Sequence, residues 1–106
     1  MNEHEEVEEE VEEGYRGPAD VVVGDRPAVT VQVQLAGNFE PISGRYVWHG
    51  RVRTLTDALG ADTDLSAGTE LQITGPEGTA TARITGVDLW GSHLVDGVTP
   101  PPFSRV

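Results

Sequence analysis

The chain has 106 residues, enough for one domain with a modest core, and its formal net charge is −11. Because this negative field repels phosphate groups, we expect neither nucleic-acid binding nor membrane binding. The chain contains no Cys, which excludes disulfides, thiolate nucleophiles and zinc–thiolate sites. An acidic N-terminus and the lack of a long apolar run predict a cytoplasmic location.

The acidity is concentrated in residues 1–14, which we interpret as an arm preceding a domain of residues 15–106. Glutamates surround Val7 and Val11, which are four residues apart and would share one side of a helix. Two interpretations stay open. The arm is either a disordered, solubilising tail or a short helix that docks through these two valines on an opening or a partner. Gly14 ends the segment in both cases.

From Tyr15 onward the hydrophobic period becomes two, which is typical of β-strands. Residues 21–23 predict one strand, and residues 29–36, in which apolar and polar side chains alternate, predict a second that pairs with it as a hairpin. We expect residues 37–44 to form a loop. Residues 45–55 predict a third strand, with Tyr46 and Trp48 on one face and His49 and Arg51 on the other.

The second half of the chain predicts short strands separated by turns. Residues 56–68 are polar and irregular, with one helical turn expected at 57–59. Residues 69–74 and 79–87 flank a Gly-Pro-Glu-Gly turn and predict a second hairpin. Gly86 and Gly91 interrupt the alternation, as bulges or barrel corners do. A last strand at 92–95 leads to prolines 100–102, which cannot join a ladder and should lie across the body.

Strands of this number and spacing predict a mainly β fold, a small antiparallel β-barrel of about six to eight strands. Its interior should be lined by rows of alternating apolar residues. These rows are Val29, Val31, Val33 and Leu35; Tyr46 and Trp48; Leu71 and Ile73; and Ala82 and Ile84.

Residues 15–19, 35–51, 88–91 and 101–103 resemble segments of one known family. The central block is similar to its G-x-F-x-P-I-x-G-R-Y-x-W-x-G-R run, from which Val47 and His49 depart. It is an actinobacterial domain family of unknown function, found alone and fused to flavin-dependent monooxygenases. The sequence is also similar to small barrel cyclases of polyketide biosynthetic clusters, which implies cycloaddition chemistry. The resemblance assigns no catalytic residue.

The candidate site is aromatic. Tyr46, Trp48 and Trp90 are expected to line a barrel cavity, with Tyr15 at its mouth, although simple core filling explains the same residues. Their O–H and N–H donors on apolar bodies suit a largely hydrocarbon ligand with a few oxygens. We therefore assign catalytic roles to Tyr15, Tyr46 and Trp48, and substrate contacts to Val31, Val33, Leu35, Phe39 and Trp90.

The function that we expect is a cofactor-independent cyclase that folds a hydrophobic polyketide-type intermediate for intramolecular cycloaddition. Such a reaction needs orientation and a hydrogen bond to a carbonyl, but no nucleophile, metal or base. The alternative is a non-catalytic small-molecule-binding or accessory domain of a flavin monooxygenase. A third interpretation is a structural dimerisation domain with a filled barrel. A homodimer would also satisfy an exposed strand edge.

The charged residues of the body receive a structural interpretation. The three histidines lack metal-ligand spacing, so we expect no metal site. Arg45 and Arg51 should pair with surface acids. Asp88 lies inward if the alternation from Ile84 holds, where an arginine would have to compensate its charge, or a bulge at Gly86 turns it outward. We favour the outward position.

Overall fold

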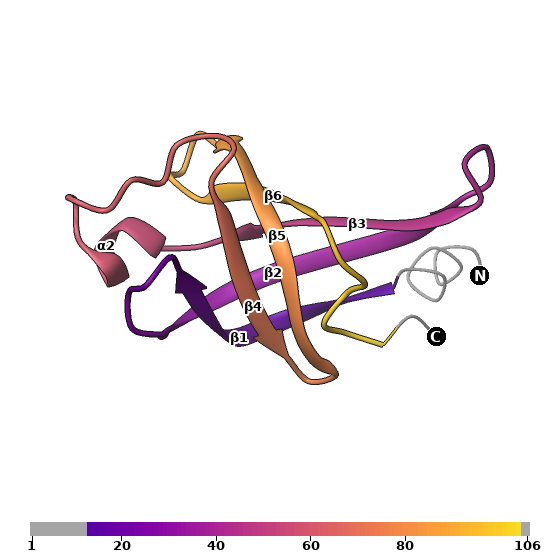
Figure 1. The fold of residues 1–106 in the computed structure, drawn as a ribbon, viewed down its shortest axis with the longest axis horizontal. Helices are drawn as coiled ribbons and strands as arrows, with labels where there is room; N and C mark the ends of the chain where they lie inside the picture. The colour runs from indigo at the N-terminus through magenta and orange to yellow at the C-terminus, as the bar shows by residue number, and fades with distance from the viewer. Residues whose placement is uncertain (1–12, 105–106) are drawn as a thin grey trace, which may run out of the picture.

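The computed structural model describes residues 13–104, which form a closed antiparallel β-barrel of six strands with one short helix (Figure 1). The elements are β1 (Glu13–Val23), β2 (Val29–Glu40), β3 (Arg45–Val52), α2 (Leu55–Leu59), β4 (Glu70–Gly75), β5 (Gly78–Val87) and β6 (His93–Gly97). Around the barrel the strand order is β1-β2-β3-β6-β5-β4. The mainly β barrel expected from the sequence is confirmed. The expectations for residues 1–12 lie outside the described residues.

Both predicted hairpins are present, but two strands are longer than expected. β1 begins at Glu13, and β2 continues to Glu40, so half of the segment 37–44 is strand and the predicted loop is confined to residues 41–44. Phe39 pairs with Tyr46 across the two strands, and the Tyr46 ring lies against Gly37, filling the space that a side chain there would need. Aromatic contacts of this kind support strand pairing past the barrel.

The extra length produces a projection. Glu13 to Gly17 pair with β2, and β2 pairs with β3 out to Glu40 and Arg45, so the β2–β3 hairpin extends beyond the barrel (Figure 1). The molecule is accordingly elongated, with extents of 50 × 30 × 24 Å. Ile42 at the tip is fully exposed.

The barrel interior is packed with apolar side chains. Val21, Val52, Ile73 and Ala82 are completely buried, because the alternation of each strand directs one set of side chains inward. Leu55 of α2 joins them and fixes the helical turn that the sequence predicted. The predicted inward rows are confirmed, with Val29 and Tyr46 half-buried at their ends.

Residues 98–104 lie across the barrel as the prolines predicted, and Trp48 holds them there. The Trp48 indole N–H donates a hydrogen bond to the Thr99 carbonyl at 2.7 Å. Phe103 packs edge-on against the indole, with a centroid distance of 6.1 Å. A side chain at Gly97 would overlap the Trp48 ring, so this glycine provides the seat for the indole.

Candidate functional site

The three aromatic residues to which we assigned catalysis have structural contacts. Trp48 donates its N–H to Thr99, and the Tyr15 hydroxyl donates to the Pro18 carbonyl at 2.7 Å. Tyr46 is half-buried and packs on the core. The donors of Tyr15 and Trp48 are therefore engaged by the chain's own backbone, where we expected them to be directed at a substrate carbonyl.

The predicted substrate contacts are divided between the core and the surface. Val31, Val33 and Leu35 lie in the packed core. Phe39 and Trp90 were expected to line an interior cavity, and the structure corrects this placement, since their side chains are 58% and 78% exposed. Phe39 lies on the projecting hairpin and Trp90 in the loop after β5, so neither reaches the barrel interior.

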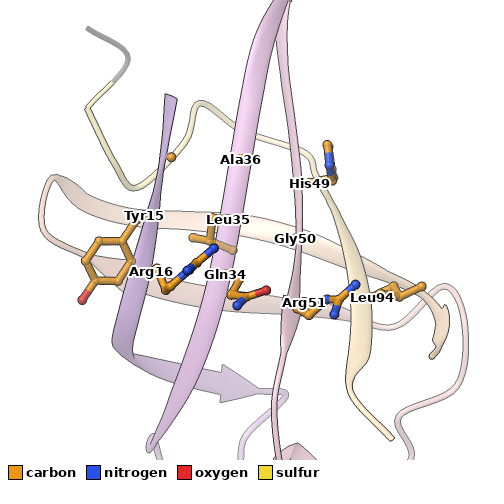
Figure 2. A pocket seen from close by; sticks show the side chains of 10 residues that line it. Tyr15, Arg16, Gln34, Leu35, Ala36, His49, Gly50, Arg51 and Leu94 are labelled. Carbon is orange, nitrogen blue, oxygen red and sulfur yellow. The ribbon is translucent and has the colours of Figure 1, made fainter. Parts of the chain in front are cut away.

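A concave pocket of about 660 Å³ instead lies on the outside of the barrel, over β1, β2, β3 and β6 (Figure 2). We call it the outer pocket. Most of its lining side chains are on the outward face of their strands, opposite in parity to the buried rows. Its lining residues are Gly14, Tyr15, Arg16, Gln34, Leu35, Ala36, His49, Gly50, Arg51 and Leu94.

The strand register explains the shape of the outer pocket. Gly14 pairs with Ala36, and Ala36 pairs with His49, so small residues occupy two neighbouring strands and leave a hollow. One row further along the strands, Arg16 pairs with Gln34 and Gln34 with Arg51. Long polar side chains therefore border a floor of small ones.

A second hollow of about 260 Å³, the side pocket, adjoins the first and shares Gln34 and Arg51 with it. Its lining residues are Gln34, Arg51, Arg53, Trp90 and Ser92. Together the two pockets place an exposed indole on the same face as Arg16, Gln34 and Arg51, which we call the arginine row.

Asp88 organises the loop that carries Trp90. One carboxylate oxygen accepts the backbone N–H groups of Trp90 and Ser92, both at 2.9 Å. The other oxygen lies 3.6 Å from a guanidinium nitrogen of Arg51. The Asp88 side chain is only 11% exposed, but it lies against Arg51, which faces outward from β3, so it is on the outer side of the barrel as favoured, and Arg51 supplies the compensating charge. The bulge predicted at Gly86 does occur, between Ile84 and Gly86.

The charge of the two pockets is opposite in sign to that of the chain. Among the residues that the structure describes, their lining includes Arg16, Arg51, Arg53 and His49 and contains no carboxylate. Asp88 and Asp96 lie at the margins, the latter opposite His49 in the strand register. In a chain of net charge −11 this face is locally cationic.

His93 is the buried ionisable group of the barrel, with 5% of its surface exposed. Burial penalises the charged imidazolium and lowers the pKa of His93 below its usual 6.5. Within residues 13–104, no group of three or more His, Asp or Glu side chains is arranged to hold a metal ion. In the same part of the chain no helix has the length and apolar character to cross a membrane.

Sequence reasoning missed the arginine row. It correctly placed His49 and Arg51 on the outward face of β3 and expected Arg51 to pair with an acid, as it does with Asp88, but it did not place Arg16 on the same face. The missing information was the register that brings Arg16 and Gln34 beside Arg51, and it depends on the β1–β2 pairing that the sequence understated.

The relatives of this chain include much longer proteins. It is 41% identical over 75 residues to the uncharacterized protein Rv0943c of Mycobacterium tuberculosis and to the uncharacterized protein Mb0968c of Mycobacterium bovis. The matched region is 71% of this chain but 20% of each relative, so the chain corresponds to about a fifth of their length. No solved structure matches the chain.

Residues 12–105 match the family described as "Domain of unknown function (DUF4873)". This match spans the whole barrel, including the outer pocket and the projecting hairpin. The chain belongs to this family.

Proposed function

We propose that the domain is a non-catalytic small-molecule-binding module and that its ligand binds in the outer pocket. The observation that carries the proposal is the position of this pocket. It has a volume typical of small-molecule sites and lies over four strands, while the barrel interior beneath is packed with valine, leucine, isoleucine and alanine.

The relatives support an accessory role. In the longer relatives, the region that matches this domain is about a fifth of the chain and is therefore joined to other parts of the same protein. We propose that the partner of the present domain is a flavin monooxygenase and that both act in the cytoplasm. In this arrangement the domain would bind a substrate or product and leave the chemistry to its partner.

Cofactor-independent cyclisation stays as a second candidate, because Tyr15, Leu35 and Leu94 contribute to the lining of the outer pocket. An apolar chain held against such a surface could be folded for ring closure. The engagement of the Tyr15 and Trp48 donors by backbone carbonyls favours the binding module over the cyclase.

The test is a titration of the isotope-labelled protein with a library of neutral and charged small molecules, followed by NMR. A binding module predicts shifts in the amide signals of Gly14, Gln34, Ala36 and Leu94 and recovery of the ligand unchanged. Conversion of a linear polyene to a cyclic product would favour the cyclase. If no compound shifts these amides, the proposal fails.

A matched pair of variants keeps the test specific. Ala36→Trp should fill the hollow and abolish the shifts, because Ala36 lies on the pocket floor. Gln72→Trp places the same side chain at an exposed position of β4 and should leave binding intact. Loss of binding in both variants would mean that the response is not local to the outer pocket.

A further inference from the structure

The arginine row of the outer pocket is arranged to hold one anionic group. Arg16, Gln34 and Arg51 are in register on β1, β2 and β3, and Figure 2 shows them in one row. Neighbouring strands are about 4.8 Å apart, so the two arginines stand about 10 Å apart on either side of Gln34. Side chains of this length can meet over Gln34, where guanidinium groups and an amide N–H would converge.

Arg51 keeps most of its hydrogen-bonding capacity. Its contact with Asp88 is 3.6 Å, longer than the roughly 2.7–2.9 Å of a charge-assisted hydrogen bond. The contact is made by one terminal nitrogen, whereas a guanidinium has five N–H donors. Asp88 therefore positions Arg51 beside the Trp90 loop without saturating it.

The same face offers apolar surface for the rest of a ligand. Leu94 and Ala36 line the outer pocket, and Trp90 lines the side pocket that shares Gln34 and Arg51. With 78% of its surface exposed, Trp90 presents a flat indole beside two arginines. A planar, largely apolar molecule could rest on this surface while its charged group reaches the row.

The negative net charge of the chain means that an anion can bind only where local positive charges attract it, as the arginine row does. Anions approaching a chain of net charge −11 are repelled unless a local site outweighs the general field. The pocket linings meet this condition, since their described residues include arginines and no carboxylate.

We propose that the ligand of the outer pocket is an organic acid, with its carboxylate or phosphate held between Arg16 and Arg51 and its flat apolar part directed along the pocket toward Trp90. This inference rests on the proposed binding function and adds the chemical class of the ligand. Guanidinium groups suit both anionic groups, because their paired N–H donors match two oxygens at once.

The test compares two fluorescent probes that share one aromatic body and differ by an anionic sulfonate group. These are 8-anilinonaphthalene-1-sulfonate and its neutral counterpart N-phenyl-1-naphthylamine, each titrated into the full chain with NMR mapping of the amides. We expect the anionic probe to bind about tenfold more tightly, with its advantage shrinking as salt is raised. Benzoate and phenyl phosphate as competitors, against neutral benzamide, distinguish the carboxylate from the phosphate.

Three variants localise the effect. Arg51→Gln should weaken binding of the anionic probe about tenfold and leave the neutral probe unchanged. The double variant Arg51→Gln/Asp88→Asn should be equally weak, which shows that an uncovered Asp88 does not cause the loss. Arg83→Gln removes an arginine paired with Glu70 on other strands and should change neither affinity.

The outcomes separate the two proposals. If both probes shift the pocket amides with equal affinity, or if Arg51→Gln has no effect, the organic-acid inference is overturned while the binding function stands. If neither probe shifts these amides, the organic-acid inference also fails. The titration with the small-molecule library then decides separately whether the domain is a binding module.

Discussion

The two faces of the β2–β3 sheet are built from alternate residues of the same strands, yet they differ in almost every physical property. Val31, Val33 and Trp48 face inward, are almost fully buried and are covered by other parts of the chain. Gln34 and Arg51 face outward into a hollow that the described residues leave open. Trp48, an aromatic donor that seemed suited to chemistry, therefore belongs to the closed face. The open face is where a ligand has room.

The largest loss of stability that distinguishes the closed face from the open face is expected for Trp48→Ala. Removal of the indole leaves a cavity, breaks the hydrogen bond to Thr99 and removes the ring on which Phe103 packs. A loss of about 3–5 kcal/mol in the free energy of unfolding is expected for a buried Trp→Ala change. Urea unfolding followed by circular dichroism measures it.

Trp90→Ala is the matched control on the open face. Because Trp90 is 78% exposed, its removal should change the unfolding free energy by no more than about 0.5 kcal/mol. Equal destabilisation by the two changes would break the division into a structural and an open face.

A smaller effect is expected for Gly97→Ala. The added methyl group would overlap the Trp48 indole, so the ring or strand β6 must move. Overpacking of this kind costs about 1–3 kcal/mol, measured as a shift of the urea midpoint. Gly86→Ala serves for comparison, because a Cβ there meets nothing within 4 Å. A Gly97→Ala variant as stable as the wild type would show that the Trp48 indole can shift without loss of stability.

The pH dependence of the unfolding free energy tests the burial of His93 inside the barrel. Because the pKa of His93 is lowered in the folded state, the unfolded chain takes up this proton first as the pH falls. His93 therefore reduces the free energy of unfolding below about pH 6.5 and has no effect at higher pH, where it is neutral in both states. Unfolding titrations at several pH values measure this loss.

Two variants show whether His93 causes the decline in stability at low pH. His93→Gln should flatten the decline in stability below pH 6.5, whereas His49→Gln, at an exposed position of the open face, should keep the wild-type profile. If the His93→Gln profile matches that of the wild type, the acid sensitivity arises from other groups.

The smallest expected effect is a change in the affinity of the open face for an anionic probe when the acidic residues of the arm are neutralised. Changing the glutamates of residues 3–12 to glutamine makes the net charge of the chain less negative without altering the arginine row. Affinity for the anionic naphthalene probe should rise about two- to fivefold at low salt and return to the wild-type value near 0.5 M, because salt screens exposed charges. Fluorescence titration measures both values. An increase that persists at high salt would contradict a purely electrostatic origin.

Much of the fold was predictable because the strands alternate strictly. The row from Val29 to Leu35 and the turn at Gly75 to Gly78 predicted two hairpins that the structure contains. The extension of β2 through Gly37, Asn38 and Phe39 was not predictable from local pattern, since glycine and asparagine are poor strand formers. Pairing with β3 and the packing of Tyr46 on Gly37 override that preference.

The candidate site was less accessible from the sequence. Aromatic type indicated Trp48 and Tyr15 as donors, but it did not identify their partners, the Thr99 and Pro18 carbonyls. Likewise, Arg16 and Arg51 are distant in the chain and are placed on either side of Gln34 only by the register of two strand pairs. The alternation along a strand predicted which face of the sheet each residue occupies. The neighbours of that residue on adjacent strands depend on the strand register, which the sequence did not predict.

Closure of the barrel determines how the chain must assemble. The β2–β3 and β4–β5 hairpins join segments close in sequence, whereas β6 inserts between β3 and β5 and pairs Val52 with the distant His93. Such non-local pairing slows folding to milliseconds or longer, while isolated hairpins form in about 1–10 microseconds. During that interval the edges of β3 and β5 have unpaired backbone groups. Aggregation during refolding should therefore start from these edges, which the finished barrel covers.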